Sequence, residues 1–319
     1  MEEKSILKIY NGVIINQLFQ IDISRYHPKH EPPGYKKITN TVVVKSGSSR
    51  LHIAIPKNKE VSKINFHASV WKLLDFLTIK FTEKNSHRCL KEKLKTKIEV
   101  PISEYIALRT EGEISDPARK KLVREIKEDL FLLSCMSIEG EEMRNENKET
   151  LPKTPICTEA TSKNGIITFV FSEALAFYLV RAFPASYPVS LMKLDAHNSN
   201  LYPVGRKLAI YHSIRNNKNK GTNKKIRVDS VLPCCPSLPL HPKVDETVHE
   251  SVRETILKGD RHWSRRIYEP FEKTLKELNF DCVLKDAGGK VIDRNAMKTM
   301  KFTEFQELFI HFSIPSEGD

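Results

Sequence analysis

The chain has 319 residues, of which 39% are hydrophobic and 29% charged, so it is long enough for two domains with separate cores. Its formal net charge of +12 indicates an acidic partner such as nucleic acid. The most apolar stretch, residues 166–180, is shorter than the ~20 residues that span a bilayer and contains Glu173, which argues against a membrane partner. The chain opens with Met-Glu-Glu-Lys and shows no apolar secretion signal. We therefore expect a cytoplasmic protein, associated with the nucleoid or a plasmid, whose six scattered cysteines remain reduced.

Residues 1–60 are expected to form a β-rich N-terminal extension. Alternating or β-branched runs lie at residues 6–23, 41–44 and 51–55, and a proline-rich loop at 27–34 separates them. No chemistry is assigned to this segment.

Residues 61–188 are expected to form a first winged-helix domain. Apolar spacing predicts a helix over residues 65–81, and a short strand and a short helix follow at 97–100 and 104–109. Ser115-Asp116-Pro117 is a strong helix start, because a capping side chain precedes a proline at the first helical turn. The helix that it opens is predicted to end at about Ser134.

The remainder of the first domain is predicted to be a wing with a long insertion. The polar segment 139–163 is expected to be a mobile loop, and a strand over 165–171 closes the wing. Ser172 predicts the start of a helix over 173–183, which the prolines of 184–188 are expected to end.

Residues 189–319 are expected to form a second winged-helix domain. A helix is predicted over residues 200–214, and a loop at 216–225 contains four lysines and no acidic residue. A strand from residue 227 runs into a short helix, and a proline-rich connection follows over 233–258.

The stretch 260–279 is predicted to form the helix on which the second domain is organised. Asp260 is a good N-cap, and Pro270 predicts a kink near residues 266–269. A strand at 280–284, a glycine turn and a second strand at 308–314 are expected to complete the wing. The apolar side of the helix is formed by Trp263, Ile267, Phe271, Leu275 and Leu278.

The fold class is therefore predicted to be α+β, with two tandem winged-helix domains and the N-terminal extension. The two domains repeat an order of elements, in which a long helix, a short helix and a basic helix precede a β-wing. No repeat of individual residues accompanies this order.

This order resembles that of the plasmid replication initiators with two winged-helix domains, which bind direct repeats at an origin. The likeness rests on the helix at 116–134, on the segments 167–171 and 199–208, and above all on 265–279. In that family the corresponding helix also carries a proline midway, as Pro270 does here.

The chain is also similar to proteins of Firmicutes mobile elements that contain an Arg-His-Trp segment followed by Glu-Pro-Phe-Glu, found here at residues 261–272. The resemblance covers residues 65–314, whereas residues 1–60 and the connection 233–258 depart from it. It implies specific binding to double-stranded DNA, and a first domain that serves dimerisation as well as DNA contact. A homodimer and a host helicase or host initiator are the implied protein partners.

Three groups of basic residues are the candidate DNA-binding residues. Arginine can contact guanine bidentately in the major groove, and lysine can neutralise phosphates. The alternative for the first group is a solvated face with internal ion pairs, because Glu269, Glu272 and Glu277 share it; for the lysines of 218–225 it is a disordered surface loop. The groups are Arg261, His262, Arg265, Arg266, Lys273 and Lys276; Lys120, Arg124 and Lys127; and Lys218, Lys220, Lys224 and Lys225.

Catalytic and metal-binding patterns are not recognisable in the sequence. Cys234 and Cys235 are adjacent and precede a proline, which suits tetrahedral zinc poorly even with His241 and His249 nearby. The histidines at 27 and 30 lack the spacing of a nicking site, and no phosphate-binding Gly-x-x-x-x-Gly-Lys loop is present. We expect no metal, no cofactor and no enzymatic activity, although catalytic residues dispersed along the chain would escape this inspection.

The leading hypothesis is a sequence-specific initiator of replication for a plasmid or an integrative element. It would bind origin repeats and recruit host replication proteins, so it would act by binding energy and not by bond chemistry. The alternatives are a winged-helix transcriptional regulator, an unrecognised nuclease or relaxase, and a structural protein with an incidental basic surface.

Overall fold

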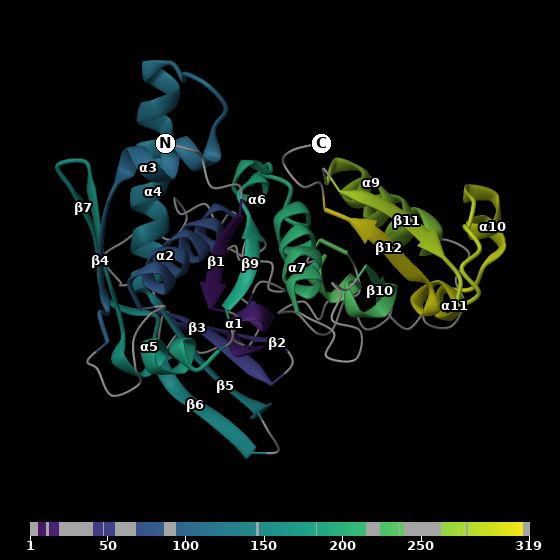
Figure 1. Cartoon of the computed structure of the whole chain (residues 1–319), viewed down its shortest axis with the longest axis horizontal. Coiled ribbons are helices and arrows are strands. Elements are labelled where there is room, and N and C mark those ends of the chain that lie inside the picture. Colours follow the sequence, from purple (N-terminus) through teal and green to yellow (C-terminus); the bar gives the residue numbers. More distant parts are fainter. Residues whose placement is uncertain are drawn as a thin grey trace, which may run out of the picture. The chain divides into compact units, whose positions relative to one another are not determined.

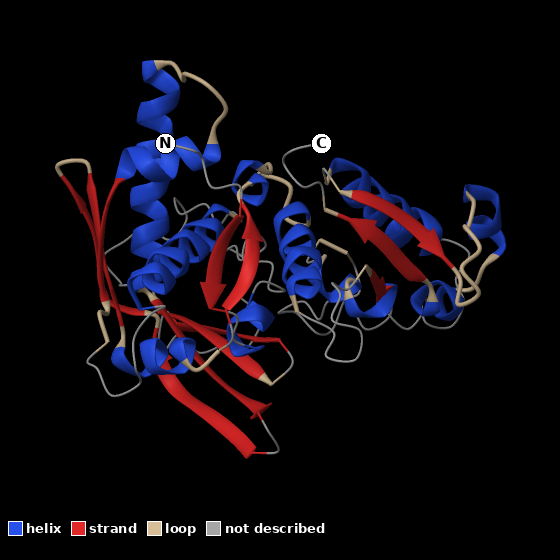
Figure 2. Ribbon diagram, viewed as in Figure 1, coloured by secondary structure: helices blue, strands red, loops and turns tan. Residues whose placement is uncertain are grey.

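The computed structural model describes residues 6–10, 13–18, 41–46, 48–54, 68–85, 94–144, 147–182, 184–214, 224–235, 237–238, 263–278 and 280–314. Within these residues the predicted α+β class is confirmed, because helices alternate with small antiparallel sheets (Figures 1 and 2). The chain divides into two compact units, residues 1–197 and 198–319, whereas the sequence predicted a start of the second domain at 189.

The first unit is built around α2 (Ser69–Asn85), where the sequence predicted a helix. Its apolar side chains, including Trp71, Phe76 and Phe81, are buried all around the helix. A helix with buried apolar side chains around most of its circumference has to be enclosed by other elements. Accordingly, α2 packs against β1 (Ile6–Tyr10), α4 (Asp116–Ser134) and β4 (Lys97–Pro101).

A three-stranded sheet and two helices give the first unit a winged-helix order. The sheet has the order β4-β8-β7, in which β7 (Cys157–Lys163) and β8 (Ile166–Phe171) form a hairpin. α3 (Ile102–Arg109) and α4 lie between β4 and β7 in the chain. α4 begins at Asp116 after Ser115, with Pro117 in its first turn, as the sequence predicted.

The prediction of a mobile loop at residues 139–163 is wrong. β5 (Met136–Arg144) and β6 (Asn147–Pro155) form a hairpin, and β7 follows it. β5 also pairs with β3 (Ser49–Ala54), which pairs with β2 (Thr41–Ser46), so the sheet has the order β2-β3-β5-β6.

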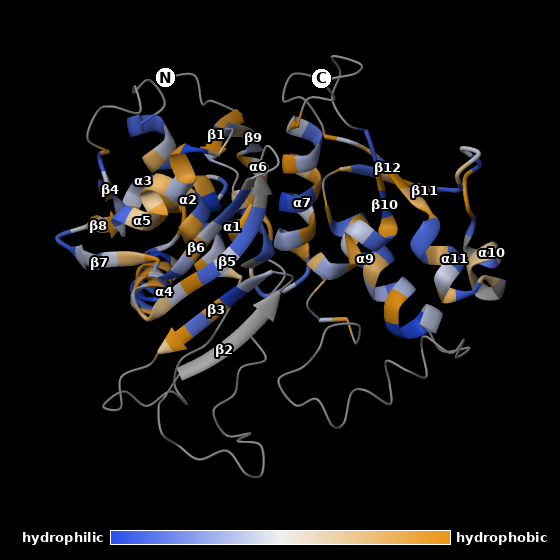
Figure 3. Ribbon diagram, turned by 90° about the horizontal axis from the view of Figure 1, so that it is seen from below, coloured by the Kyte–Doolittle hydropathy of each residue, from blue (hydrophilic) through white to orange (hydrophobic). Residues whose placement is uncertain are grey.

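Two features explain why this segment resembles a loop in its sequence. One face of the sheet meets solvent, so hydrophilic and hydrophobic residues alternate along β3 and β5 (Figure 3). The partner strand is distant in the chain, since Arg50 and the Glu139 side chain to which it donates are separated by 89 positions. No local pattern reveals a partner at that distance.

Described strands of residues 1–60 belong to the sheets of the first unit. β1 pairs with β9 (Pro184–Pro188), so the proline-rich segment predicted only to end a helix is a strand. The helix before it, α5 (Glu173–Val180), ends three residues earlier than predicted. α1 (Val13–Leu18) is held by Glu142, whose carboxylate accepts from the backbone N–H of Val13 and from Tyr178.

The second unit repeats the order of the first. Its sheet has the order β10-β12-β11, so the last strand again lies between the first two, as in β4-β8-β7. Between β10 and β11 the described residues form two short 3₁₀ turns, and then a longer helix that begins with a π-helical turn. The elements are α7 (Leu201–Ser213), β10 (Lys225–Arg227), η3 (Val228–Ser230), η4 (Leu232–Cys234), η5 (Ser264–Tyr268), α9 (Glu269–Glu277), β11 (Asp281–Lys285) and β12 (Phe309–Ser313).

The wing of the second unit contains two helices that the sequence did not predict, α10 (Arg294–Thr299) and α11 (Phe302–Glu307). A turn after β11 places Gly289 at a φ of 86°, a conformation that glycine adopts without strain. The predicted strands on both sides of this wing are confirmed as β11 and β12. In the part of the chain described above, no helix combines the length and the apolar character needed to cross a membrane.

Candidate nucleic-acid interface

The predicted apolar side of the helix at residues 260–279 is confirmed over its described part. Trp263, Ile267, Phe271, Leu275 and Leu278 are all buried. Two of them, Trp263 and Phe271, contact one aromatic residue of the wing.

Phe305 on α11 is the centre of this aromatic cluster. Its ring lies 5.1 Å from that of Trp263, 5.9 Å from that of Tyr268 and 6.0 Å from that of Phe271, measured between centroids. The indole Nε1 of Trp263 donates to the backbone oxygen of Met300 at 3.0 Å. The wing therefore fixes the rotation of this helix about its axis, and with it the direction of the outer side chains.

The disturbance predicted from Pro270 takes the form of a π-helical turn, η5, directly before it. The N–H of Glu269 donates to the oxygen of Ser264, five residues earlier. Pro270 has no N–H to donate, and in a regular α-helix its ring would clash with the carbonyl of Arg266. The wider π turn relieves that clash, and α9 continues the helix beyond it.

The outer face of this helix is only partly open. Arg265 and Arg266 are exposed and form no ion pair with any residue that the structure describes. Lys273 and Lys276, in contrast, lie 3.6 Å and 2.9 Å from Glu277 and Glu272, one helical turn away. Exposed pairs of this kind are weak and can exchange partners. Within residues 263–278, the two arginines are the cations that have no such partner.

The basic loop predicted at residues 216–225 is described only at its end. Lys218, Lys220, Arg261 and His262 lie outside the described residues. Lys224 and Lys225 are exposed, but Lys225 belongs to β10. Its neighbour Ile226 points into the core, so by strand alternation Lys225 projects from the opposite face of the sheet, away from the helices.

The cations predicted on α4 lie on an exposed side of the first unit. Lys120, Arg124 and Lys127 are all solvent-exposed, and Arg124 has a long contact of 3.9 Å with Glu128. Two cations that the prediction omitted, Arg119 and Lys121, share the exposed first turns of this helix. Every residue from Asp116 to Lys121 is exposed, so the start of α4 protrudes from the unit (Figure 1).

A cleft of about 260 Å³ separates α4 from the turn of the β7–β8 hairpin. Arg119, Val123 and Lys127 follow one another at intervals of four along α4 and form one wall. The hairpin and the start of α3 form the other walls, with polar side chains and backbone groups. These walls are lined by Ile102, Ser103, Ser162, Asn164 and Gly165.

The turn of the hairpin has a sequence signal that the prediction did not use. Asn164 and Gly165 have φ values of 51° and 76°, as a two-residue type I′ turn requires at both positions. An Asn-Gly pair between two β-prone runs is a strong hairpin signal. It would have located this wing, and with it Ser162 and Asn164 beside the basic helix.

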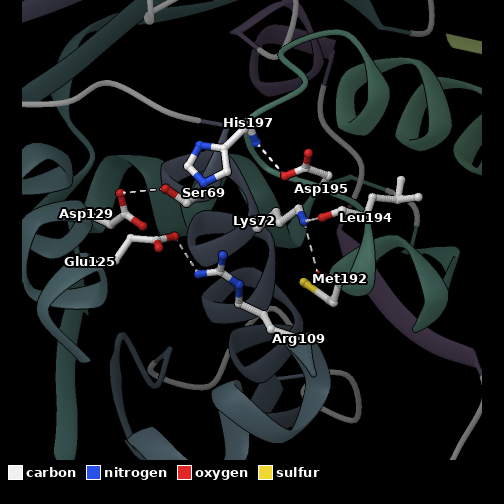
Figure 4. Close-up of polar contacts among 9 residues, drawn as sticks. All are labelled: Ser69, Lys72, Arg109, Glu125, Asp129, Met192, Leu194, Asp195 and His197. Carbon is white, nitrogen blue, oxygen red and sulfur yellow. Dashed lines mark hydrogen bonds and ion pairs between the residues drawn. The ribbon is translucent and has the colours of Figure 1, made fainter. Parts of the chain in front are cut away.

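A buried polar network positions α4 against α2 and α3 (Figure 4). Ser69 donates to Asp129 at 3.1 Å, and Arg109 lies 2.8 Å from Glu125. Burial, followed by the nearby Glu125, raises the pKa of Asp129 well above its usual value, which favours the protonated form of this carboxyl group.

Lys72 extends the same network toward the end of the first unit. Its ammonium group donates to the backbone oxygens of Met192, at 3.2 Å, and Leu194. Burial and then Arg109 lower the pKa of Lys72 to about 7. Lys72 thus holds the end of α6 (Ser190–Lys193), a few residues before the second unit begins.

The two cysteines considered for zinc are buried in the second unit. Burial raises the pKa of Cys234 to about 11, which favours the protonated thiol. His241 and His249 lie outside the described residues, as do the histidines at 27 and 30.

No protein-family model matches the chain, and no curated protein matches it. Among solved structures, the crystal structure of domain 2 and domain 3 of RctB is similar, with a TM-score of 0.42 and 12% sequence identity. That similarity covers 95% of this chain and 100% of the RctB chain. A likeness at this level assigns no function to the chain.

Proposed function

We propose that this protein binds double-stranded DNA through its two winged-helix units. The observation that carries the proposal is the exposed, cationic start of α4 beside the cleft and the β7–β8 hairpin. The face of Arg265 and Arg266 is proposed as a second contact surface.

The shape of α4 supports insertion into a groove. The major groove of B-DNA is about 12 Å wide and accepts an α-helix, which is about 10–12 Å across with its side chains. The first turns of α4 meet this requirement, because each of their side chains is exposed. Lys120 and Arg124 would then reach base edges or the flanking phosphates.

The cleft supports a contact with the sugar-phosphate backbone. Arg119 and Lys127 face the hairpin from α4, while Ser103, Ser162 and Asn164 supply hydrogen-bonding groups around the same space. Cations and neutral donors of this kind account for most protein–phosphate contacts. A backbone strand held there would fix the register of α4 on the duplex.

The finer proposal is an initiator of replication for a plasmid or a mobile element, which binds direct repeats as a homodimer and recruits host proteins. Its support is the resemblance of residues 65–314 to that family and the presence of two recognition helices in one chain. A transcriptional regulator would use the same surfaces. The two are distinguished by whether the protein, supplied with its own flanking DNA, maintains a plasmid that has no other origin.

DNA binding can be tested by titrating the full chain against labelled duplex DNA from both sides of its own gene, at two salt concentrations and with competitor DNA. The triple variant Arg119→Ala, Arg124→Ala, Lys127→Ala should bind all duplexes more weakly. Its salt dependence should fall by about one unit of slope for each phosphate that the variant no longer neutralises.

The matched control is the double variant Lys148→Ala, Arg181→Ala. Both residues are exposed cations of the same unit, but they pair with Glu141 and Glu149 on the other sheet. Equal binding by the wild type, the triple variant and this control would contradict the proposed surface. Nicking of supercoiled DNA in the presence of Mg²⁺ would instead support the nuclease alternative.

A further inference from the structure

The outer face of the sheet of the second unit carries an unusual set of side chains. Ile226, Leu284 and Ile310 are aligned across the strands on the inner face. Their neighbours alternate to the outer face, where the strands meet solvent. These outer residues are Lys225 and Arg227 on β10, Phe309 and His311 on β12, and Val283 and Lys285 on β11.

The register brings the cations and the ring systems together. Lys225 lies opposite His311, which lies opposite Val283; Arg227 lies opposite Phe309, which lies opposite Lys285. The ammonium group of Lys225 is 5.5 Å from the centroid of the Phe309 ring.

Each of these groups can take part in binding. Burial, and then Lys285 and Lys225, lower the pKa of His311, so its imidazole is neutral at physiological pH and able to stack. Arg227 pairs with Asp229 at 2.9 Å, but its side chain is 48% exposed, so the pair can open at little cost. Val283 is 39% exposed and adds an apolar surface beside the rings.

The first unit offers an internal comparison. Its sheet has the same strand order, but the corresponding face carries Lys97 and Glu99 paired at 2.8 Å, together with Thr168 and Glu159. With Lys163, which lies on the same face of β7, the two lysines there balance the two glutamates in charge, and these residues include no aromatic ring. The cationic and aromatic character is therefore specific to the second unit and does not follow from the fold.

We propose that the outer face of the β10-β12-β11 sheet binds single-stranded nucleic acid, with a base stacked on Phe309 and phosphates held by Lys225, Arg227 and Lys285. Bases stack on aromatic side chains regardless of sequence, and surrounding cations follow the backbone. Flat sheets that present an aromatic ring to splayed bases are a recurrent solution for this ligand.

A duplex fits this face less well than a single strand does. The grooves of B-DNA admit a helix or a two-stranded ribbon, whereas this surface is the flat side of three strands. The bases of a duplex are also stacked on one another and cannot reach Phe309. The proposal does not depend on duplex binding by α4, which lies in the other unit.

The test measures fluorescence anisotropy of labelled dT and rU oligonucleotides of about 15 nucleotides, a length near the upper site size of one binding module, with the full chain. Phe309→Leu keeps an apolar side chain but removes the ring, and should weaken binding about ten-fold. Phe309→Tyr keeps the ring and should bind like the wild type.

Lys225→Gln with Lys285→Gln should weaken binding and reduce its salt dependence. The two oligonucleotides distinguish DNA from RNA as the source of the single strand.

The matched control is Lys97→Gln with Lys163→Gln, which removes two exposed cations from the sheet of the first unit. It should leave single-strand binding unchanged. Retention of wild-type affinity by both the Phe309→Leu and the lysine variants would overturn the proposal. So would an equal loss of single-strand and duplex binding, or displacement of the oligonucleotide by an acidic peptide of equal charge, which would assign the face to a protein. The α4 triple variant should still bind the single-stranded oligonucleotide. Loss of duplex binding through α4 can therefore be distinguished from loss of single-strand binding by the sheet of the second unit.

Discussion

Arg109 and Glu125 form an ion pair, with 2.8 Å between Nη1 and Oε1, on the side of α4 that meets α3. The pair is largely buried, since the two side chains are 10% and 20% exposed. It directs a carboxylate of α4 toward the interior of the unit. The exposed side of the same helix therefore keeps its excess of cations, which is the property that DNA binding requires.

Loss of Arg109 should destabilise the first unit. The variant Arg109→Met leaves Glu125 largely buried without its partner, and breaking a buried pair from one side costs about 3–5 kcal/mol. The double variant Arg109→Met, Glu125→Gln should recover part of this loss. Urea denaturation monitored by circular dichroism measures the free energy of unfolding of both variants. A loss below about 1 kcal/mol for Arg109→Met would show that the ion pair behaves as an exposed one.

The cations of the second-unit helix should differ in their effect on specific binding. Arg265→Ala and Arg266→Ala should each weaken binding to the preferred duplex by about 1–3 kcal/mol, if these exposed arginines contact bases. Lys273→Ala and Lys276→Ala should have smaller effects, because those lysines pair with Glu277 and Glu272. Competition between the preferred and a scrambled duplex measures the difference. Equal effects of all four substitutions would argue for phosphate contact alone.

Truncation of Phe305 should destabilise the second unit. Phe305 is fully buried and contacts Trp263, Tyr268 and Phe271, so Phe305→Ala should cost about 3–5 kcal/mol. Hydrogen exchange should show lower protection over residues 263–278 and little change in α2. Uniform loss across both units would show that they unfold together. Gln306→Ala, on the same helix, serves as the control for substitution itself.

The buried Asp129 predicts a dependence of stability on pH. Its pKa in the folded protein lies above the usual 3.8, because burial disfavours the charged form. The folded state therefore retains a proton that the unfolded chain releases, and stability falls as pH rises from about 4 through the folded pKa. Asp129→Asn cannot lose a proton, so it should be more stable relative to wild type at pH 7.5 than at pH 4.5. Urea denaturation at both pH values measures the difference in stability between the variant and the wild type. An equal difference at pH 4.5 and pH 7.5 would refute the raised pKa of Asp129.

Local signals accounted for the elements that depend on neighbouring residues. The burial of Trp263, Phe271 and Leu275 follows from their spacing, and the start of α4 follows from Ser115-Asp116-Pro117. In these cases the residues that determine the element lie within a few positions of one another in the sequence. The same reasoning located the exposed cations of α4.

Long-range pairing decided what the sequence could not reveal. The sequence of β5 resembles a polar loop because its partner β3 lies far earlier in the chain, and β6 pairs, among the described strands, only with β5. The sequence of β9 resembles a helix stop because its partner β1 is distant in the chain. Lys225 is grouped with a loop by its neighbours in sequence, although its strand partner His311 places it on a sheet. The cleft beside α4 also required the packing of the β7–β8 hairpin, which no single segment specifies.

The most direct test of the DNA-binding proposal is the affinity of the Arg119→Ala, Arg124→Ala, Lys127→Ala variant for duplex DNA at two salt concentrations, beside the Lys148→Ala, Arg181→Ala control. We predict weaker binding and a lower salt dependence for the first variant, with the control close to wild type. Identical affinities and salt dependences for all three proteins would contradict the proposal that this face of α4 binds DNA.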